Sequence, residues 1–175
     1  MTWHRTLLRH NFGVAMVEPI SDGVVELRAP RAGDSTRLIE GRDEVFHRFL
    51  GAGSSEPQPT ACIVVGGEVV GWVDYDVDRR WLAPEEVNVG YNVFAEHRGK
   101  GYATRAVELL MRHFAEATDY SVATLLIDPA NERSLALAAR AGFTRVADLD
   151  GNRHFKRTVQ RRDTVTPDVV HEERC

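Results

Sequence analysis

The stretch from residue 86 to residue 116 joins a strand pattern to a helix pattern through a turn with two glycines, and it constrains the fold more than any other part of the sequence. From Glu86 to Val93, apolar and polar residues alternate with the period of two that is typical of a β-strand. From Ala103 onward, apolar residues recur at helical spacing, with charged residues on the opposite face. The turn between the two patterns therefore lies at the N-terminus of a predicted helix.

A glycine-rich turn at a helix N-terminus is a typical anion-binding site. The first amide groups of a helix have no intrahelical acceptor, and the helix dipole favours negative charge at this end. Gly99 and Gly101 allow the backbone to approach a ligand closely, and Arg98 and Lys100 add positive charge. The sequence therefore predicts a phosphate-binding turn, although a tight bend without a ligand would need the same glycines.

Two nucleotide-binding motifs can be compared with this turn. A P-loop requires Gly-Lys followed by Ser or Thr, but Gly101 follows Gly99 and Lys100, so a P-loop is excluded. A dinucleotide-binding fingerprint needs a third glycine, and Thr104 stands at that position, where its side chain would crowd the helix against the strand. This second interpretation is weakened and stays open.

The residues from Arg98 to Ala103 resemble the pyrophosphate loop of the GNAT superfamily of acyl-CoA-dependent N-acyltransferases, which reads Gln or Arg, two residues, Gly, one residue, then Gly or Ala. Val89-Gly90-Tyr91 resembles the Ile-Gly-Tyr run of the branch that acetylates ribosomal-protein N-termini, and Asn131–Ser134 and Ala141–Phe143 also resemble that branch. The resemblance covers residues 61–159. It implies an α/β (α+β) fold with a mixed, mostly antiparallel central sheet that is split near the acetyl-CoA site and flanked by helices.

The resemblance also implies where CoA is bound. The amide of Val93 or Phe94, just before the loop, would stabilise the oxyanion of the tetrahedral intermediate. Asn131 would cap the next helix while its amide contacts pantetheine. The CoA pyrophosphate would be bound, largely through backbone amides, by Arg98, Gly99, Lys100, Gly101, Tyr102, Ala103 and Thr104.

Transfer of an acyl group to an amine requires a neutral nucleophile, whereas an unperturbed alkyl ammonium has a pKa of about 10.4. Glu86 is the candidate base, because strand alternation places it on one face with Asn88 and Gly90. Related sequences of the ribosomal branch often carry an acid at the position of Asn88. A solvated carboxylate at the start of a strand is an equally simple interpretation of Glu86.

The departing thiolate also needs a proton or a hydrogen bond, since the thiol pKa is about 8.5. Many family members place a Tyr four residues before the Gly of the Gly-Phe pair, where this chain has Ala138. The ribosomal branch uses a Ser three residues after its Asn, and Ser134 matches that position. Ser134 could equally be only a polar residue of the first helical turn.

Turn and capping signals predict the remaining elements. Asp34 is expected to cap a short helix through Ile39, a second short helix is expected from Asp43 to Leu50, and the helix after Asn131 is expected to end at Gly142. Residues 51–59 form a loop by composition. Strands are predicted over residues 24–28, 61–65, 68–76, 122–127, 143–147 and 154–159.

A chain of 175 residues is long enough for one complete core and short for two. We therefore expect one domain over residues 1–159, which the resemblance implies to be an acetyltransferase domain, and a polar tail over residues 160–175, with residues 1–12 unassigned. The two cysteines offer no disulfide framework, and Cys62 is expected to be a small buried hydrophobe. The histidines lack ligand spacing, so no metal site is expected, and His97 is interpreted as a solvent-facing turn residue.

The net charge of −4 and the lack of a Lys/Arg run give no support for DNA or RNA binding. No apolar run approaches membrane-spanning length, so membrane binding is not expected. The N-terminus lacks the pattern of a secretion signal, which makes the cytoplasm the expected location. A homodimer is left open.

The resemblance to the GNAT superfamily implies an acetyl-CoA-dependent N-acetyltransferase that uses acetyl-CoA as cosubstrate. The acceptor is a primary amine, either a peptide N-terminus or a small molecule, and Asp74 and Asn88 are the candidate residues beside it. The acidic group around Asp74 would suit a cationic amine, although acidic side chains near strand ends are more often only solvated. The alternative is a regulatory module that binds acetyl-CoA or a dinucleotide without turnover.

Overall fold

An eight-stranded sheet runs through the part of the chain that the computed structural model describes, namely residue 16 and residues 18–161. The unassigned segment 1–12, and the predicted tail apart from Gln160 and Arg161, lie outside the described residues. The strand order is β1-β2-β3-β4-β5-β6-β8-β7. The strands are β1 (Ile20–Ser21), β2 (Glu26–Arg28), β3 (Ala61–Val65), β4 (Glu68–Asp76), β5 (Glu86–Val93), β6 (Val122–Ile127), β7 (Thr144–Leu149) and β8 (Asn152–Thr158).

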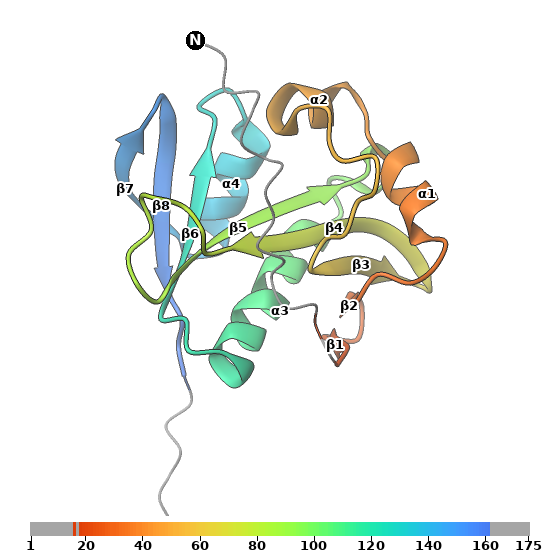
Figure 1. Cartoon of the computed structure of the whole chain (residues 1–175), viewed down its shortest axis with the longest axis horizontal. Coiled ribbons are helices and arrows are strands. Elements are labelled where there is room, and N and C mark those ends of the chain that lie inside the picture. The colour runs from red at the N-terminus through yellow and green to blue at the C-terminus, as the bar shows by residue number, and fades with distance from the viewer. Residues whose placement is uncertain (1–15, 17, 162–175) are drawn as a thin grey trace, which may run out of the picture.

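Neighbouring strands of this sheet are antiparallel except for β5 and β6. That parallel pair extends only from Glu86–Asn88 to Val122–Thr124, after which β5 pairs with β4 alone and β6 with β8 alone. Figure 1 shows β5 and β6 running apart beyond this short contact. The expected mixed, mostly antiparallel and split sheet is therefore confirmed.

Helices cover both faces of the sheet (Figure 1). The long helix α3 (Tyr102–Ala117) and α4 (Glu132–Arg140) bury their apolar residues in the main core, which also contains alternate side chains of β5 and β6. On the other face, Leu38 of α1 (Asp34–Glu40) packs with Cys62 and Phe94 in a smaller cluster. The short helices α2 (Glu44–Leu50) and η1 (Ala95–His97) complete the fold.

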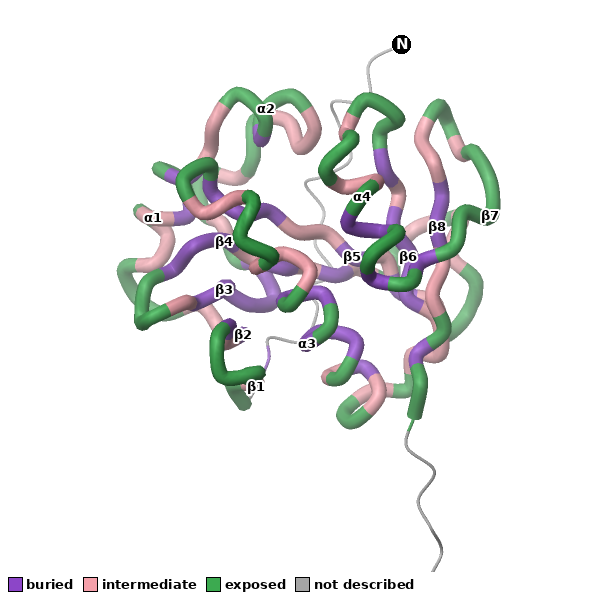
Figure 2. Tube along the Cα trace, turned by 180° about the vertical axis from the view of Figure 1, so that it is seen from behind, coloured by how far each residue is buried: buried purple, intermediate pink, exposed green. Residues whose placement is uncertain are grey.

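Burial alternates along the second half of β4 and the first half of β5, as the period-two pattern requires. Figure 2 shows the buried stretches of the central strands in purple and the exposed turns in green. Val87 and Val89 are buried against α3, while Glu86 and Asn88 are only partly buried. Cys62 is fully buried, as predicted. Because each strand side chain faces opposite to its neighbour, the register of β5 decides which polar groups face away from α3.

Local backbone chemistry explains the two predicted hairpins. Gly66 and Gly67 have φ angles of 58° and 84° between β3 and β4, and Asp150 and Gly151 have 50° and 81° between β7 and β8. Successive positive φ angles are typical of tight hairpin turns and favour Gly, Asn and Asp. Both hairpin predictions are confirmed.

The second predicted short helix is present as α2, and Asp43 is its N-cap, because its side chain accepts a hydrogen bond from the amide of Phe46 at 2.9 Å. The capping prediction for Asp34 is wrong. The N-cap of α1 is Gly33, with φ 94°, and Asp34 is the first helical residue. Its carboxylate instead pairs with Arg28 at the end of β2 at 2.7 Å and accepts from the amide of Arg31 at 2.7 Å, contacts that a capping rule does not include.

Candidate active site

The turn before α3 has the backbone geometry of an anion site. Gly99 and Gly101 have φ angles of 76° and 80°, in the left-handed region that favours glycine. Gly101 is the N-cap of α3, no side chain caps the helix, and its first turn contains no acidic residue. The first intrahelical hydrogen bond runs from the amide of Arg105 to Gly101, so the amides of residues 102–104 have no acceptor within the helix.

A cleft of about 730 Å³ lies beside this turn and follows the split between β5 and β6. Its walls come from α2, the ends of β5 and β6, the turn before α3, and the start of α4. Of the predicted cofactor and catalytic residues, those that line it are Val93, Arg98, Gly99, Gly101, Tyr102, Ala103, Thr104, Asn131 and Ser134.

The other predicted residues lie elsewhere. Lys100 is exposed on the turn, and Phe94 is fully buried in the core cluster below α1. Glu86, Asn88 and Asp74 are outside the lining of the cleft, on strands β5 and β4.

The Arg98 side chain is used as an anchor for the turn. Its guanidinium donates to both carboxylate oxygens of Asp43, at 2.6 and 2.9 Å, and its Nε donates to the carbonyl of Val93 at 2.7 Å. The hydrogen bond from Arg98 holds the pKa of Asp43 at about 2. The charge that the sequence assigned to phosphate binding is therefore neutralised by Asp43, and the pairing of residues so distant in sequence gives no local signal.

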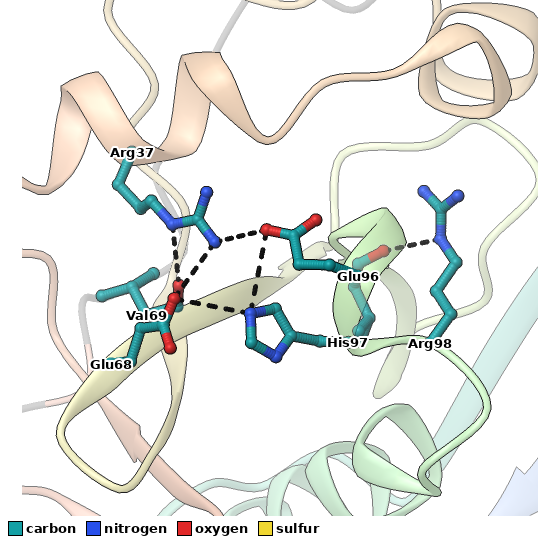
Figure 3. Close-up of polar contacts among 7 residues, drawn as sticks. Arg37, Glu68, Val69, Glu96, His97 and Arg98 are labelled. Atoms are coloured by element: carbon teal, nitrogen blue, oxygen red, sulfur yellow. Dashed lines mark hydrogen bonds and ion pairs between the residues drawn. The ribbon is translucent and has the colours of Figure 1, made fainter.

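A second polar network fixes η1 next to the turn (Figure 3). Arg37 of α1 donates to Glu96 at 2.6 Å and to Glu68 at 3.3 Å, while His97 Nε2 lies 3.4 Å from Glu68. The His97 side chain is only 15% exposed, so its interpretation as a solvent-facing residue is wrong. These contacts connect α1 and the β3–β4 hairpin to η1, and so hold the start of the turn in place.

The two candidate oxyanion donors differ in where their amides point. The amide of Phe94 donates to the carbonyl of Val70 at 2.9 Å, so it is already used within the β4–β5 ladder. Residues of an antiparallel strand alternate between bonding the partner strand and facing away from it. The peptide groups of Val93 therefore face the split, where its carbonyl accepts from Arg98.

Asn131 and Ser134 begin α4 at the cleft. The Asn131 side chain caps the helix by accepting from the Ser134 amide at 3.2 Å, which confirms the predicted cap. The backbone amide of Asn131 donates to Asp128 at 2.9 Å, so its side-chain nitrogen is the donor that remains for a ligand. Ser134 thus combines a position in the first helical turn with a position on the cleft wall.

Tyr91 lines the same cleft and was not selected from the sequence as a site residue. Its hydroxyl is buried and has no hydrogen-bond partner among the described residues. Burial raises the pKa of Tyr91 to about 12, and the nearby Ser134 side chain and the charge of Arg140 partly oppose that rise. The Ser134 side chain thus lies close to the phenol without the geometry of a hydrogen bond.

Glu86 is held in an ion pair. Its Oε1 lies 2.5 Å from Nζ of Lys156 on β8, and its Oε2 accepts from the amide of Ala83 at 3.2 Å. Burial would raise the pKa of Glu86, but the hydrogen bonds from Lys156 and Ala83 bring it below its usual value. A lowered pKa keeps Glu86 ionised at neutral pH and makes it a weaker base.

Polar groups without partners lie on the same sheet face as Glu86. The register places Asn88 opposite Thr124 and Thr124 opposite Lys156, with His154 two residues along β8 on that face. The side-chain atoms Asn88 Oδ1, Thr124 Oγ1 and His154 Nε2 are buried without hydrogen bonds among the described residues. Thr124 and His154 were missed, because only the strand register brings them to Asn88.

Asp74 also belongs to this face, opposite Gly90. One carboxylate oxygen, Oδ1, accepts from the Thr60 hydroxyl at 2.7 Å and from the Tyr75 amide at 2.9 Å. Burial raises the pKa of Asp74 above its usual value. Asp74 therefore ties the end of the loop before β3 to the sheet.

Among the described residues, no group of three or more His, Cys, Asp or Glu side chains is arranged to hold a metal ion. None of the helices in residues 18–161 is long and apolar enough to cross a membrane.

The split sheet, the uncapped glycine turn and the adjoining cleft define an α/β protein in which a helix N-terminus opens on a cleft between two diverging strands. The sequence model of the acetyltransferase (GNAT) domain matches residues 35–144. The chain therefore belongs to the GNAT acetyltransferase family.

Solved structures agree with this assignment of the fold. RimL, a ribosomal L7/L12 alpha-N-protein acetyltransferase in complex with coenzyme A, superposes with a TM-score of 0.67 and 19% identity over 81% of this chain and 98% of that chain. Mycobacterium smegmatis RimJ in complex with CoA-disulfide gives 0.64 and 22% over 81% and 86%. A GNAT-family acetyltransferase from Bacillus anthracis gives 0.63 and 14% over 79% and 96%. A search of curated protein sequences finds no match.

Proposed function

We propose that the protein is an acetyl-CoA-dependent N-acetyltransferase that moves an acetyl group to a primary amine by direct attack of the amine on the thioester. The observation that carries this proposal is the uncapped helix N-terminus at Gly101, which opens on a cleft that follows the split between β5 and β6. Pyrophosphate would bind the amides of residues 99–104, and pantetheine would extend along the split toward α4.

The peptide amide of Val93 is the proposed oxyanion donor. It faces the split, whereas the amide of Phe94 is bonded to Val70. A preorganised amide of this kind stabilises charge that develops on the carbonyl oxygen during attack, typically by about 3–4 kcal/mol. The Arg98 contact to the Val93 carbonyl would fix the orientation of this peptide.

Glu86 is the proposed general base, which accepts the proton that the amine loses. Its carboxylate is ionised at neutral pH because of the Lys156 ion pair, so it attracts an ammonium group before it accepts a proton. The polar face that Glu86 shares with Asn88 would receive the acceptor, and Asp74 would support that face from the neighbouring strand.

The acceptor class is proposed to be a peptide N-terminus or a small-molecule amine. The likeness to RimL and RimJ supports the first of these, and the carboxylates of Asp74 and Glu86 suit either cationic acceptor.

A screen of small amines and N-terminal peptides with acetyl-CoA tests this function. Release of CoA thiol and mass analysis of the acceptor should reveal at least one acetylated amine. Binding of acetyl-CoA with no turnover on any acceptor would instead favour a regulatory module that senses acetyl-CoA.

A further inference from the structure

Tyr91 presents a buried hydroxyl that the fold leaves unpaired. Among the described residues no group forms a hydrogen bond with its Oη, although the atom is inaccessible to solvent. Buried hydroxyls are normally paired, so an unpaired one in the wall of a binding cleft indicates a partner that arrives with the ligand.

The surroundings of this hydroxyl indicate which part of the ligand it meets. Tyr91 lies on β5 beyond the last residue that pairs with β6, so its ring borders the split. Its ring packs against the main core on the α4 side, and Ser134 and Arg140 of α4 are near enough to affect its pKa. Ser134 and Tyr91 both line the cleft, so the hydroxyl lies where the split meets the first turn of α4.

We propose that the Tyr91 hydroxyl donates a hydrogen bond to the sulfur of CoA and stabilises the thiolate as it leaves, a role that nothing in the sequence motifs assigned to β5. The inference rests on the proposed function, because it requires CoA in the cleft. In this proposal Tyr91 stabilises the leaving thiolate, a role for which Ser134 was the candidate from the sequence. Ser134 lies beside Tyr91 at the N-terminus of α4.

The electron and proton balance of the step is simple. The amine nitrogen forms a bond to the carbonyl carbon, the C–S bond breaks, and its electron pair moves to sulfur. The amine proton leaves toward the Glu86 face, and the thiolate takes a proton from solvent after it leaves the cleft. Tyr91 gains and loses no proton overall, since it acts as a neutral donor.

The environment of Tyr91 fits a neutral donor. A pKa raised to about 12 keeps the phenol protonated throughout the working pH range, so it can always donate. A thioester sulfur accepts hydrogen bonds weakly and a thiolate accepts them strongly, so this contact strengthens as C–S cleavage proceeds. An interaction that grows toward the transition state accelerates the chemical step.

The test measures the pKa of the CoA thiol while CoA is bound. Thiolate absorbance is titrated with pH for the full-length protein saturated with CoA, and the same protein with desulfo-CoA provides the background. Tyr91→Phe should raise the pKa of the bound thiol by about 1–2 units, because the thiolate loses one charge-assisted hydrogen bond. Tyr120→Phe is the matched control, since Tyr120 packs against Phe114 outside the cleft.

The outcomes separate this inference from the proposed function. Single-turnover acetyl transfer by Tyr91→Phe should fall by about tenfold to a hundredfold with little change in acetyl-CoA affinity. An unchanged thiol pKa in Tyr91→Phe, or an equal shift in Tyr120→Phe, would overturn the role of Tyr91 and leave the function standing. A shift in Ser134→Ala with none in Tyr91→Phe would return the role to Ser134. Failure of the wild-type protein to bind CoA would overturn both proposals.

Discussion

At the scale of single residues, Glu86 shows how tertiary contacts change the chemistry of a side chain. Strand alternation predicted its face, and the structure agrees, but the ion pair with Lys156 depends on a strand contributed much later in the chain. The ion pair lowers the pKa of Glu86, so a rise in rate near neutral pH must come from deprotonation of the amine.

Glu86→Gln should therefore slow acetyl transfer by about a hundredfold at pH 7, the lower end of the range for positioned proton transfer. The rate should recover partly at high pH, where hydroxide replaces the missing base. Single-turnover rates measured against pH provide the test, since product release could mask the loss.

Glu85→Gln is the matched control for this variant. Glu85 is adjacent and exposed, and its carboxylate contacts only Ser121 among the described side chains. An unchanged pH profile in Glu86→Gln would assign proton removal to another group on this face.

At the scale of elements, the ion pair between Asp43 and Arg98 connects the N-terminus of α2 to the turn before α3. Asp43 caps α2 and accepts hydrogen bonds from both terminal nitrogens of Arg98, whose side chain is 16% exposed. The turn therefore takes part of its rigidity from a helix that lies more than fifty residues earlier in the sequence.

Asp43→Asn isolates the charge, because Asn is an equally good cap. We expect the free energy of unfolding to fall by about 1–2 kcal/mol, a discounted value for a partly exposed pair. Affinity for acetyl-CoA should also fall, since the turn loses its anchor. Urea denaturation and calorimetry measure the two effects.

Asp148→Asn provides the comparison, because Asp148 forms a similar two-oxygen contact with Arg145 but is 62% exposed. Its unfolding free energy should change by less than about 0.5 kcal/mol. Equal losses in the two variants would contradict an anchoring role for Asp43.

At the scale of the whole molecule, acid should reduce stability in two ranges. Burial lowers the pKa of His113 and His154, so the unfolded chain binds protons more readily and stability falls as pH decreases through about 6.5. Asp22 and Asp43 have folded pKa values of about 2, so their contribution is complete above about pH 4 and is lost as pH falls toward 2.

Urea unfolding at pH 7.5, 5 and 3 measures these losses. Asp43→Asn should lose less stability between pH 5 and pH 3 than the wild type does, because it lacks one of the groups that titrate there. Equal losses in the two proteins would contradict the assignment of that range to Asp43.

The sequence predicted the parts of the molecule that depend on local chemistry. The glycine turn, the Gly66-Gly67 hairpin and the Asn131 cap are each specified by a few adjacent residues. The anchor at Arg98 and the unpaired hydroxyl of Tyr91 were missed, because each depends on segments that meet only in the folded chain. Registers between β5, β6 and β8 likewise decide which polar side chains share a face.

The central claim, that the turn at Gly101 binds the pyrophosphate of acetyl-CoA, is tested most directly by calorimetry on a matched pair of variants. Asn and Asp both tolerate the left-handed backbone of Gly101, and a Cβ there meets no atom within 4 Å, so the two variants differ mainly in charge.

The wild type should bind acetyl-CoA and not NAD, Gly101→Asn should retain most of that affinity, and Gly101→Asp should bind at least about a hundredfold more weakly. Wild-type affinity in Gly101→Asp, or tight binding of NAD without acetyl-CoA, would contradict the account.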